Sequence, residues 1–332
     1  MSGERPEPRI PHLGQARRQR RAVGGLAGWG VMLPSFDPHR IGTPPLLESA
    51  ELAEDLGFDS LWVGDHLAYH APVLEATCAL SAVAARTHLP RVGYAVMLLA
   101  LRHPVWAAKQ IATLEAMAPG RVVLGVGVGG ENPAEFEASG VPLGGRGKRL
   151  DDALQIVTAL LRGEALEPGD PRLTGGSPAL SPVPGRMLPL VVGGRSAKAL
   201  SRAARLGDGW MGVWLDRLRL ERSMAQLGEQ AAAFGRKAPE TILMLQANVG
   251  QDRRQAENEA EAWVGGQYGL VFEALKRWVF VGDEASLAES LSGFVEAGVS
   301  GFVLGPAGPD PLRQIERFAA AVALVEARTP AG

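Results

Sequence analysis

Short apolar runs alternate with amphipathic stretches along the chain from residue 26 to residue 327. Apolar runs of this length are typical of strands buried on both faces of a parallel sheet, and amphipathic stretches between them are typical of the helices that cover it. We count eight such units. The predicted strands are Gly28–Leu33, Phe58–Gly64, Val92–Leu99, Val122–Val128, Leu188–Val192, Gly209–Trp214, Ile242–Val249 and Gly301–Leu304.

Each predicted strand leads into a predicted helix. Thr43, Pro44 and Pro45 open the first helix and Gly57 follows it, which matches the preference for proline at helix starts and glycine at helix ends. The predicted helices are Pro45–Leu56, Leu74–Arg86, Val105–Met117, Arg149–Leu161, Ala197–Leu206, Asp216–Phe234, a helix from Ala256–Ala262 onward, and Pro311–Ala327.

The pattern predicts one α/β domain over residues 26–328, a (β/α)8 TIM barrel. An open doubly wound sheet shares the local pattern, but eight units with no single reversal of strand order favour closure. Two long connections, residues 130–187 and 250–300, predict insertions after strands 4 and 7 that shape a pocket. Residues 1–25, rich in Arg, Pro and Gly, are predicted to form a disordered tail.

Composition excludes several classes of protein. A net charge of −2 leaves no basic field for nucleic acid. The longest apolar run, residues 92–101, is too short to cross a bilayer as a helix. The lone cysteine, Cys78, excludes an internal disulfide and a thiolate-rich metal site, so we expect a cytoplasmic protein. Apolar neighbours predict core positions for Trp62, Trp106 and Trp210.

Residues capable of chemistry follow four of the predicted strands. Because parallel strands end at one face of a barrel, we expect these residues to meet there. Asp65 and His66 follow the second strand, where His66 could transfer a proton and Asp65 could fix its tautomer or hold a backbone turn. Alternatively, Asp65 caps the next segment and His66 is a polar residue at the rim. A metal site with His70 lacks any accompanying ligand motif.

The glycine run at residues 125–130 matches the spacing G-x-G-x-x-G. We reject a dinucleotide fold, because Asp151 and Asp152 lie in a predicted helix and not at the end of a second strand. The glycines instead allow tight packing and the close approach of a flat ring. Glu131 could then protonate a ring nitrogen or bind substrate, or it could simply lie in the first turn of a helix opened by Pro133.

Gly193, Gly194, Arg195 and Ser196 join the fifth strand to a helix start. Free backbone N–H groups at such a start bind phosphate, and Arg195 could add a charged contact. The alternative is a tight turn in which Ser196 only caps the helix.

These motifs in this order resemble the bacterial luciferase-like superfamily of flavin- and deazaflavin-dependent oxidoreductases, whose fold is a (β/α)8 barrel. The resemblance extends from Gly28 to Ala327. Its most specific stretches are residues 53–66, Arg102-His103-Pro104 leading to residues 120–127, and residues 189–194 through Gly207-Asp208-Gly209-Trp210.

The resemblance is strongest to the branch that uses coenzyme F420, and it implies roles for single residues. It implies His66 beside the hydride-accepting carbon and Glu131 near the ring as the catalytic residues, and a non-prolyl cis peptide near Ala95-Val96. It also implies a phosphate site at the turn after the fifth strand. The implied cofactor-binding residues are Asp65, Ala95, Val96, Gly129, Gly130, Gly193, Gly194, Arg195 and Ser196.

The implied activity is hydride transfer between F420 and a small, fairly apolar organic molecule. Met211-Gly212-Val213-Trp214 lacks the Thr and Lys that grip a sugar phosphate in that branch, which argues against glucose 6-phosphate. An FMN-dependent monooxygenase and a flavin-binding barrel without turnover are the alternatives. The resemblance also implies a homodimer.

Overall fold

The computed structural model describes residues 22–42, 45–173 and 175–328. Residues 1–21 of the predicted tail lie outside the described residues. Val23 is already buried, and the amide of Gly24 donates a hydrogen bond to the carbonyl of Ser300. The packed chain therefore begins slightly before the predicted domain boundary at residue 26.

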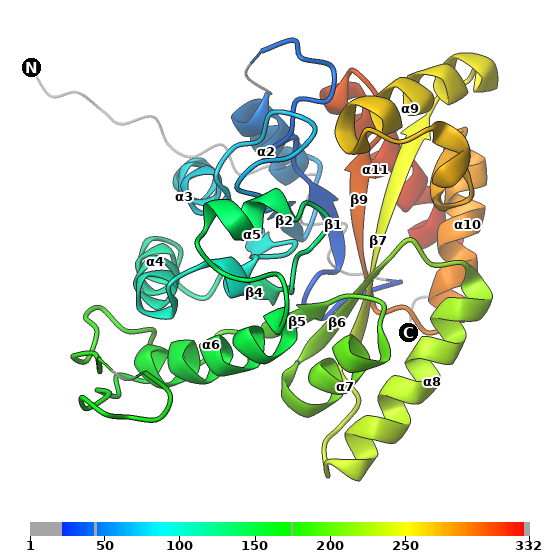
Figure 1. Ribbon diagram of the computed structural model, residues 1–332. Helices are drawn as coiled ribbons and strands as arrows, with labels where there is room; N and C mark the ends of the chain where they lie inside the picture. The colour runs from blue at the N-terminus through cyan, green and yellow to red at the C-terminus, as the bar shows by residue number, and fades with distance from the viewer. Residues whose placement is uncertain (1–21, 43–44, 174, 329–332) are drawn as a thin grey trace, which may run out of the picture.

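Parallel strands close into a barrel, which confirms the predicted (β/α)8 fold (Figure 1). Within the described residues the ring runs from β1 through β6 to β7 and β9, and β9 pairs with β1 to close it. Its strands are β1 (Trp29–Met32), β2 (Ser60–Val63), β3 (Arg91–Tyr94), β4 (Val122–Val126), β5 (Leu190–Gly193), β6 (Gly209–Val213), β7 (Glu240–Val249) and β9 (Gly301–Pro306).

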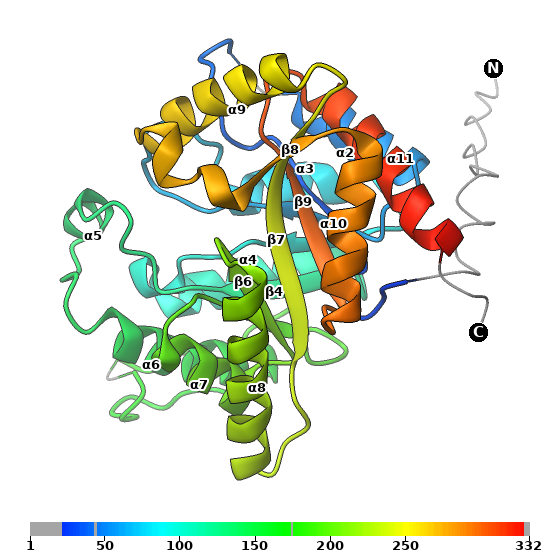
Figure 2. The same ribbon diagram turned by 90° about the vertical axis from the view of Figure 1, so that its right-hand side faces the viewer.

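Helices surround the barrel (Figure 2). The helices that follow the strands are α2 (Leu46–Asp55), α3 (Ala76–Arg86), α4 (Pro104–Met117), α6 (Arg146–Leu161), α7 (Ala197–Leu206), α8 (Arg217–Ala233), α9 (Arg253–Tyr268) and α11 (Pro311–Arg328). Every predicted helix is present. No described helix is long and apolar enough to cross a membrane.

The two long connections contain a short helix, a short strand and a longer helix that were not predicted. The helix α5 (Ala134–Ala138) lies between β4 and α6, and the strand β8 (Val279–Gly282) precedes α10 (Glu284–Glu296). β8 pairs with the second half of β7 outside the ring. The ten-residue β7 is long enough to serve both partners, because its first half completes the barrel with β6 and β9.

The third strand ends earlier than predicted. β3 stops at Tyr94 instead of Leu99, and the next peptide bond, Ala95-Val96, is cis as the resemblance implied. The chain bulges there and then rejoins β4, since the amide of Met97 donates to the carbonyl of Gly125. A 3-10 turn, η1 (Leu99–Leu101), follows.

The glycine run at residues 125–130 has the packing role that the sequence predicted. A Cβ on Gly125 would lie 1.9 Å from the carbonyl oxygen of Tyr94, and one on Gly127 would lie 2.4 Å from the Val96 side chain. A side chain at either position would collide with the bulge after β3. β4 therefore needs glycine here to lie beside the bulge.

Two of the three tryptophans predicted in the core are there. Trp62 and Trp210 are fully buried, but Trp106 is 70% exposed, so that prediction was wrong. The buried face of α4 consists of small and aliphatic residues that include Ala107, Ala108 and Ile111. The apolar neighbours of Trp106 in sequence therefore lie on the other side of its helix.

Candidate active site

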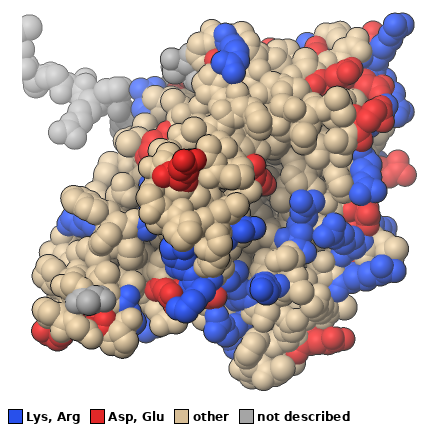
Figure 3. All heavy atoms as spheres, viewed as in Figure 1, with Lys and Arg blue, Asp and Glu red and all other residues tan. Residues whose placement is uncertain are grey.

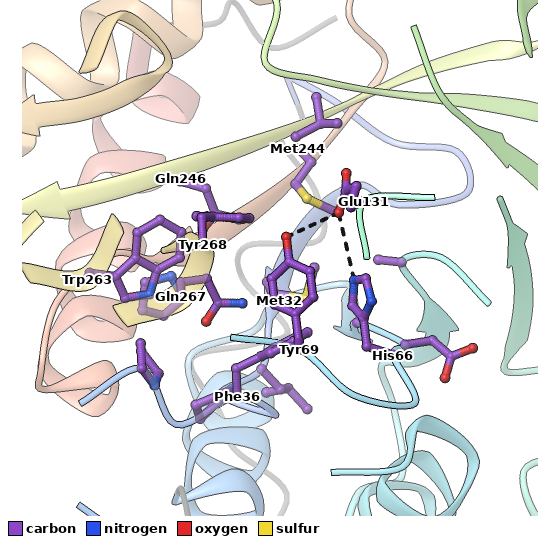
Figure 4. A pocket seen from close by; sticks show the side chains of 18 of the residues that line it. Met32, Phe36, His66, Tyr69, Glu131, Met244, Gln246, Trp263, Gln267 and Tyr268 are labelled. Atoms are coloured by element: carbon purple, nitrogen blue, oxygen red, sulfur yellow. Dashed lines mark hydrogen bonds and ion pairs between the residues drawn. The ribbon is translucent and has the colours of Figure 1, made fainter. Parts of the chain in front are cut away.

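A cavity of about 290 Å³ lies at the C-terminal ends of the barrel strands (Figure 4). The predicted site residues that line it are Asp65, His66, Ala95, Val96, Gly129, Glu131, Gly193 and Gly194. Gly130, Arg195 and Ser196 are outside this lining, although Arg195 and Ser196 directly follow it in the chain. The strand ends thus bring together most of what the sequence singled out.

His66 is held by a buried carboxylate that the sequence did not single out. Nδ1 of His66 lies 3.1 Å from Oε2 of Glu135, on α5, and Glu135 is 1% exposed. Oε1 of the same carboxylate accepts hydrogen bonds from the amides of Leu67 at 2.7 Å and Ala68 at 3.3 Å. A carboxylate can only accept, so Nδ1 carries the proton and Nε2 is left for the cavity.

Asp65 acts on the backbone and not on His66. It accepts hydrogen bonds from the amide of Leu98 at 2.8 Å and from Nη2 of Arg102 at 2.7 Å. The prediction that Asp65 fixes the tautomer of His66 was wrong, because Glu135 occupies Nδ1. The alternative, that Asp65 holds a backbone turn, is confirmed: it ties the loop after β2 to the bulge after β3.

Glu131 and Tyr69 complete a small polar group around His66 (Figure 4). Oε2 of Glu131 lies 3.8 Å from Nε2 of His66 and accepts a hydrogen bond from the Tyr69 hydroxyl at 3.3 Å. The rings of His66 and Tyr69 lie 4.1 Å apart, tilted by 31°. Burial, and then the negative charge of Glu131, raise the pKa of Tyr69 well above its usual value. Tyr69 therefore remains a proton donor at neutral pH.

One wall of the cavity, the glycine wall, is formed by glycine backbone and the Val96 side chain. The Val96 side chain fills the space that a Cβ on Gly127 or Gly193 would need, since the contacts would be 2.4 Å and 3.0 Å. Gly129 and Gly194 also line the cavity. A planar ring would therefore lie against Val96 beside Gly127 and Gly193, and it could approach the backbone beside Gly129 and Gly194.

The opposite wall is aromatic and comes from other elements. Tyr268 lies edge-on to Tyr69, Trp214 and Trp263, with ring centroids 5.5–6.0 Å apart. These rings border the cavity and give this side of it an apolar surface.

The turn after β5 leaves backbone donors free. Ser196 caps α7 by accepting a hydrogen bond from the amide of Ala199 at 3.2 Å, which confirms its predicted cap. Within the described chain, the amides of residues 195–198 have no hydrogen-bond partner. Partial burial, and then the charge of Arg219, lower the pKa of Arg195. Figure 3 shows Lys and Arg side chains gathered over this part of the face. The arrangement suits a phosphate.

We expect Gly194→Val to weaken cofactor binding at least about tenfold, roughly 1.4 kcal/mol. Gly194 has a φ of +127°, and a Cβ there would lie 2.9 Å from the Cβ of Ala199. The variant would therefore displace the turn that presents the free amides. Fluorescence titration measures the affinity, with Gly185→Val as control because Gly185 faces open space. Unchanged affinity in a folded Gly194 variant would remove the phosphate site from this turn.

Comparisons with known proteins assign this barrel to a family. The sequence model of the luciferase-like monooxygenase family matches residues 29–301. The chain therefore belongs to the luciferase-like monooxygenase family, as the sequence resemblance predicted.

Individual relatives carry more specific names. An uncharacterized protein of Mycobacterium tuberculosis is 32% identical over 221 residues, 60% of this chain and 75% of the relative. An F420-dependent glucose-6-phosphate dehydrogenase of Beutenbergia cavernae is 30% identical over 313 residues, 82% of this chain and 90% of the relative. The structure of an F420-dependent secondary alcohol dehydrogenase with an F420–acetone adduct is similar in fold, with a TM-score of 0.76 at 22% identity over 90% of this chain and 98% of that chain.

Proposed function

We propose that this protein is an F420-dependent oxidoreductase that transfers hydride between the cofactor and a small, neutral, fairly apolar organic molecule. The observation that carries the proposal is the group formed by His66, Glu131 and Tyr69 at the mouth of a cavity whose glycine wall is completed by Val96. The naming of similar proteins as F420-dependent dehydrogenases supports the choice of cofactor.

The cavity fits the ring system of such a cofactor on physical grounds. Gly127 and Gly193 leave room for Val96, which lines the cavity with Gly129, so a ring would lie against the Val96 side chain. The free amides of residues 195–198, with Arg195, would hold the phosphate. When bound, F420 would supply a ring carbon that exchanges hydride, and the protein supplies orientation and electrostatics.

The protein groups have separate tasks in this proposal. A substrate carbon loses hydride most readily when a neighbouring heteroatom also loses its proton, so a base must stand beside it. His66 supplies Nε2 as that base, because Nδ1 already donates to Glu135. Glu131 lies beside Nε2 as an acceptor and itself accepts a hydrogen bond from Tyr69, so a proton could be passed from Nε2 to Glu131.

The proposed substrate is not glucose 6-phosphate, the sugar phosphate in the name of the relative from B. cavernae. A sugar phosphate needs cationic partners, yet among the described residues that line the cavity none is Lys or Arg. Met211 and Trp214 line the cavity at the segment that lacks the Thr and Lys expected for binding a sugar phosphate. We therefore propose that glucose 6-phosphate is not a substrate.

The cofactor assignment is tested by titrating F420 and FMN separately into the purified protein and following ring fluorescence. We expect micromolar or tighter binding of F420, and a reduced complex that persists in air and passes hydride to an organic acceptor. Tight FMN binding with rapid oxygen consumption and no F420 affinity would identify a monooxygenase instead. Cofactor binding with no turnover across a substrate panel would identify a barrel that binds the cofactor without catalysing a reaction.

We also propose a cytoplasmic homodimer with one barrel domain, from the single cysteine and the family resemblance. Light scattering of the full chain measures the mass in solution, and a monomer would contradict the dimer.

A further inference from the structure

We propose that the aromatic side of the cavity recognises a neutral substrate group that both accepts and donates hydrogen bonds, such as a carboxamide, through Gln246 and Gln267. The inference rests on the proposed function for the role of this cavity as a substrate site. It adds the chemistry of the group that is bound and the residues that bind it.

Gln246 lies on the inner face of β7 with a side chain that no protein group engages. It lines the cavity two residues after Met244, and it is 5% exposed. A Cβ on Gly305 of β9 would lie 2.0 Å from its Oε1, so the glycine leaves the room that the amide occupies. Within the described chain, neither atom of this amide has a hydrogen-bond partner. Because the residue lines the cavity and its amide atoms are not among the fully enclosed unpartnered atoms, the amide is open to a group bound in the cavity.

Gln267 supplies a second such amide from α9. It lies one helical turn after Trp263, it is 5% exposed, and it too has no hydrogen-bond partner among the residues that the structure describes. Figure 4 shows its amide directed toward Met32 and Tyr69. His39 lines the same cavity, and its Nε2 is buried with no partner in the described chain.

The charges around the cavity favour a neutral ligand. Three carboxylates line it, those of Asp37, Asp65 and Glu131. Asp37 accepts hydrogen bonds from two amides of its own loop, and Asp65 is paired with Arg102. Glu131 faces His66 and Tyr69. An anion would be buried without a counter-charge, because none of the described residues that line the cavity is Lys or Arg. Glu131, whose side chain is 61% exposed, remains open to a cation. The charges therefore favour a neutral ligand over an anion.

The position of the amides fits a substrate anchor. Figure 4 shows Gln246, Gln267, Trp263 and Tyr268 on one side of the cavity and His66 with Glu131 on the other, with Tyr69 between them. A molecule held by its polar group at the amides would extend its remaining carbons past the aromatic rings toward Nε2 of His66. The glycine wall stays free for the cofactor.

Three probes of equal ring size test the inference: benzamide, benzoate and toluene, titrated into the full chain without cofactor and followed by ligand-observed NMR. We expect benzamide to bind at least about tenfold more tightly than benzoate. Gln267→Met and Gln246→Met should each weaken benzamide about threefold to tenfold and leave toluene unchanged. Gln255→Met, on the exposed side of α9, is the matched control and should change neither.

Other outcomes overturn the inference. Benzoate binding as tightly as benzamide would mean that the cavity does not select neutral groups. An equal loss of benzamide and toluene in folded variants would mean that the amides shape the cavity and do not bind the polar group. Because no cofactor is present, failure of F420 to bind would contradict the proposed function without changing either result.

Discussion

His66→Ala is expected to lower turnover about 10²–10⁴-fold, the usual cost of removing a positioned acid or base, while cofactor affinity stays within twofold. The side chain is 12% exposed and contributes Nε2 to the cavity. His66 forms no part of the glycine wall or of the free amides of residues 195–198, which are the parts proposed to hold the cofactor. Single-turnover kinetics and a fluorescence titration on the same preparation separate the two quantities.

His88→Ala is the matched control, because His88 is exposed on the loop before β3. It should have wild-type rates. Wild-type turnover in the His66 variant would return His66 to the rim, which was the alternative interpretation from the sequence. Loss of the cofactor together with turnover would show that His66 holds the ring and has no separate chemical task.

Glu135→Gln is expected to lower turnover about tenfold or more, with cofactor affinity unchanged, because it reverses the tautomer of His66. Oε1 of Glu135 accepts both backbone hydrogen bonds, so the amide oxygen should take that place and leave its NH2 facing Nδ1. Nδ1 must then accept, and the proton moves to Nε2. Nitrogen NMR of the ring reports the tautomer directly, independent of activity.

A second substitution separates positioning from packing. Glu135→Ala leaves the amides of Leu67 and Ala68 without an acceptor and should lower the free energy of unfolding by about 2–4 kcal/mol. Glu135→Gln should cost far less stability. Glu137→Gln, on the exposed face of the same helix, is the control. An unchanged tautomer and rate in a folded Glu135→Gln variant would leave Glu135 a purely structural residue.

The barrel could be predicted because the same sequence pattern, an apolar strand followed by an amphipathic helix, occurs eight times. Eight apolar runs with helices between them leave few ways to bury both faces of every strand. β8 escaped prediction because it pairs with β7 outside the ring and so falls outside the alternation of strand and helix on which the prediction rests. The end of β3 was misplaced because Met97, Leu98 and Leu99 are as apolar as a strand, although the chain has already turned at Ala95. Hydrophobicity shows burial and does not show backbone direction.

The cavity lining could be predicted where residues lie at or shortly after the ends of strands, as His66, Glu131 and Gly193 do. Glu135 was missed because an acid in the first turn of a helix commonly interacts with its own helix dipole. Its partner is 69 residues away, and only the closed barrel brings them together. Gln246 gave no signal, since a polar residue within an apolar strand looks like an interruption.

The contact of Val96 with the position of Gly127 constrains how this protein can change over time. A Cβ at position 127 would lie 2.4 Å from the Val96 side chain, so alanine there is tolerated only after residue 96 has become smaller. The route therefore has a required order, and positions 96 and 127 should vary together among descendants of this protein. A library that changes one position at a time would score Gly127→Ala as not tolerated, whereas a library that varies both positions jointly would recover folded barrels with a differently shaped floor.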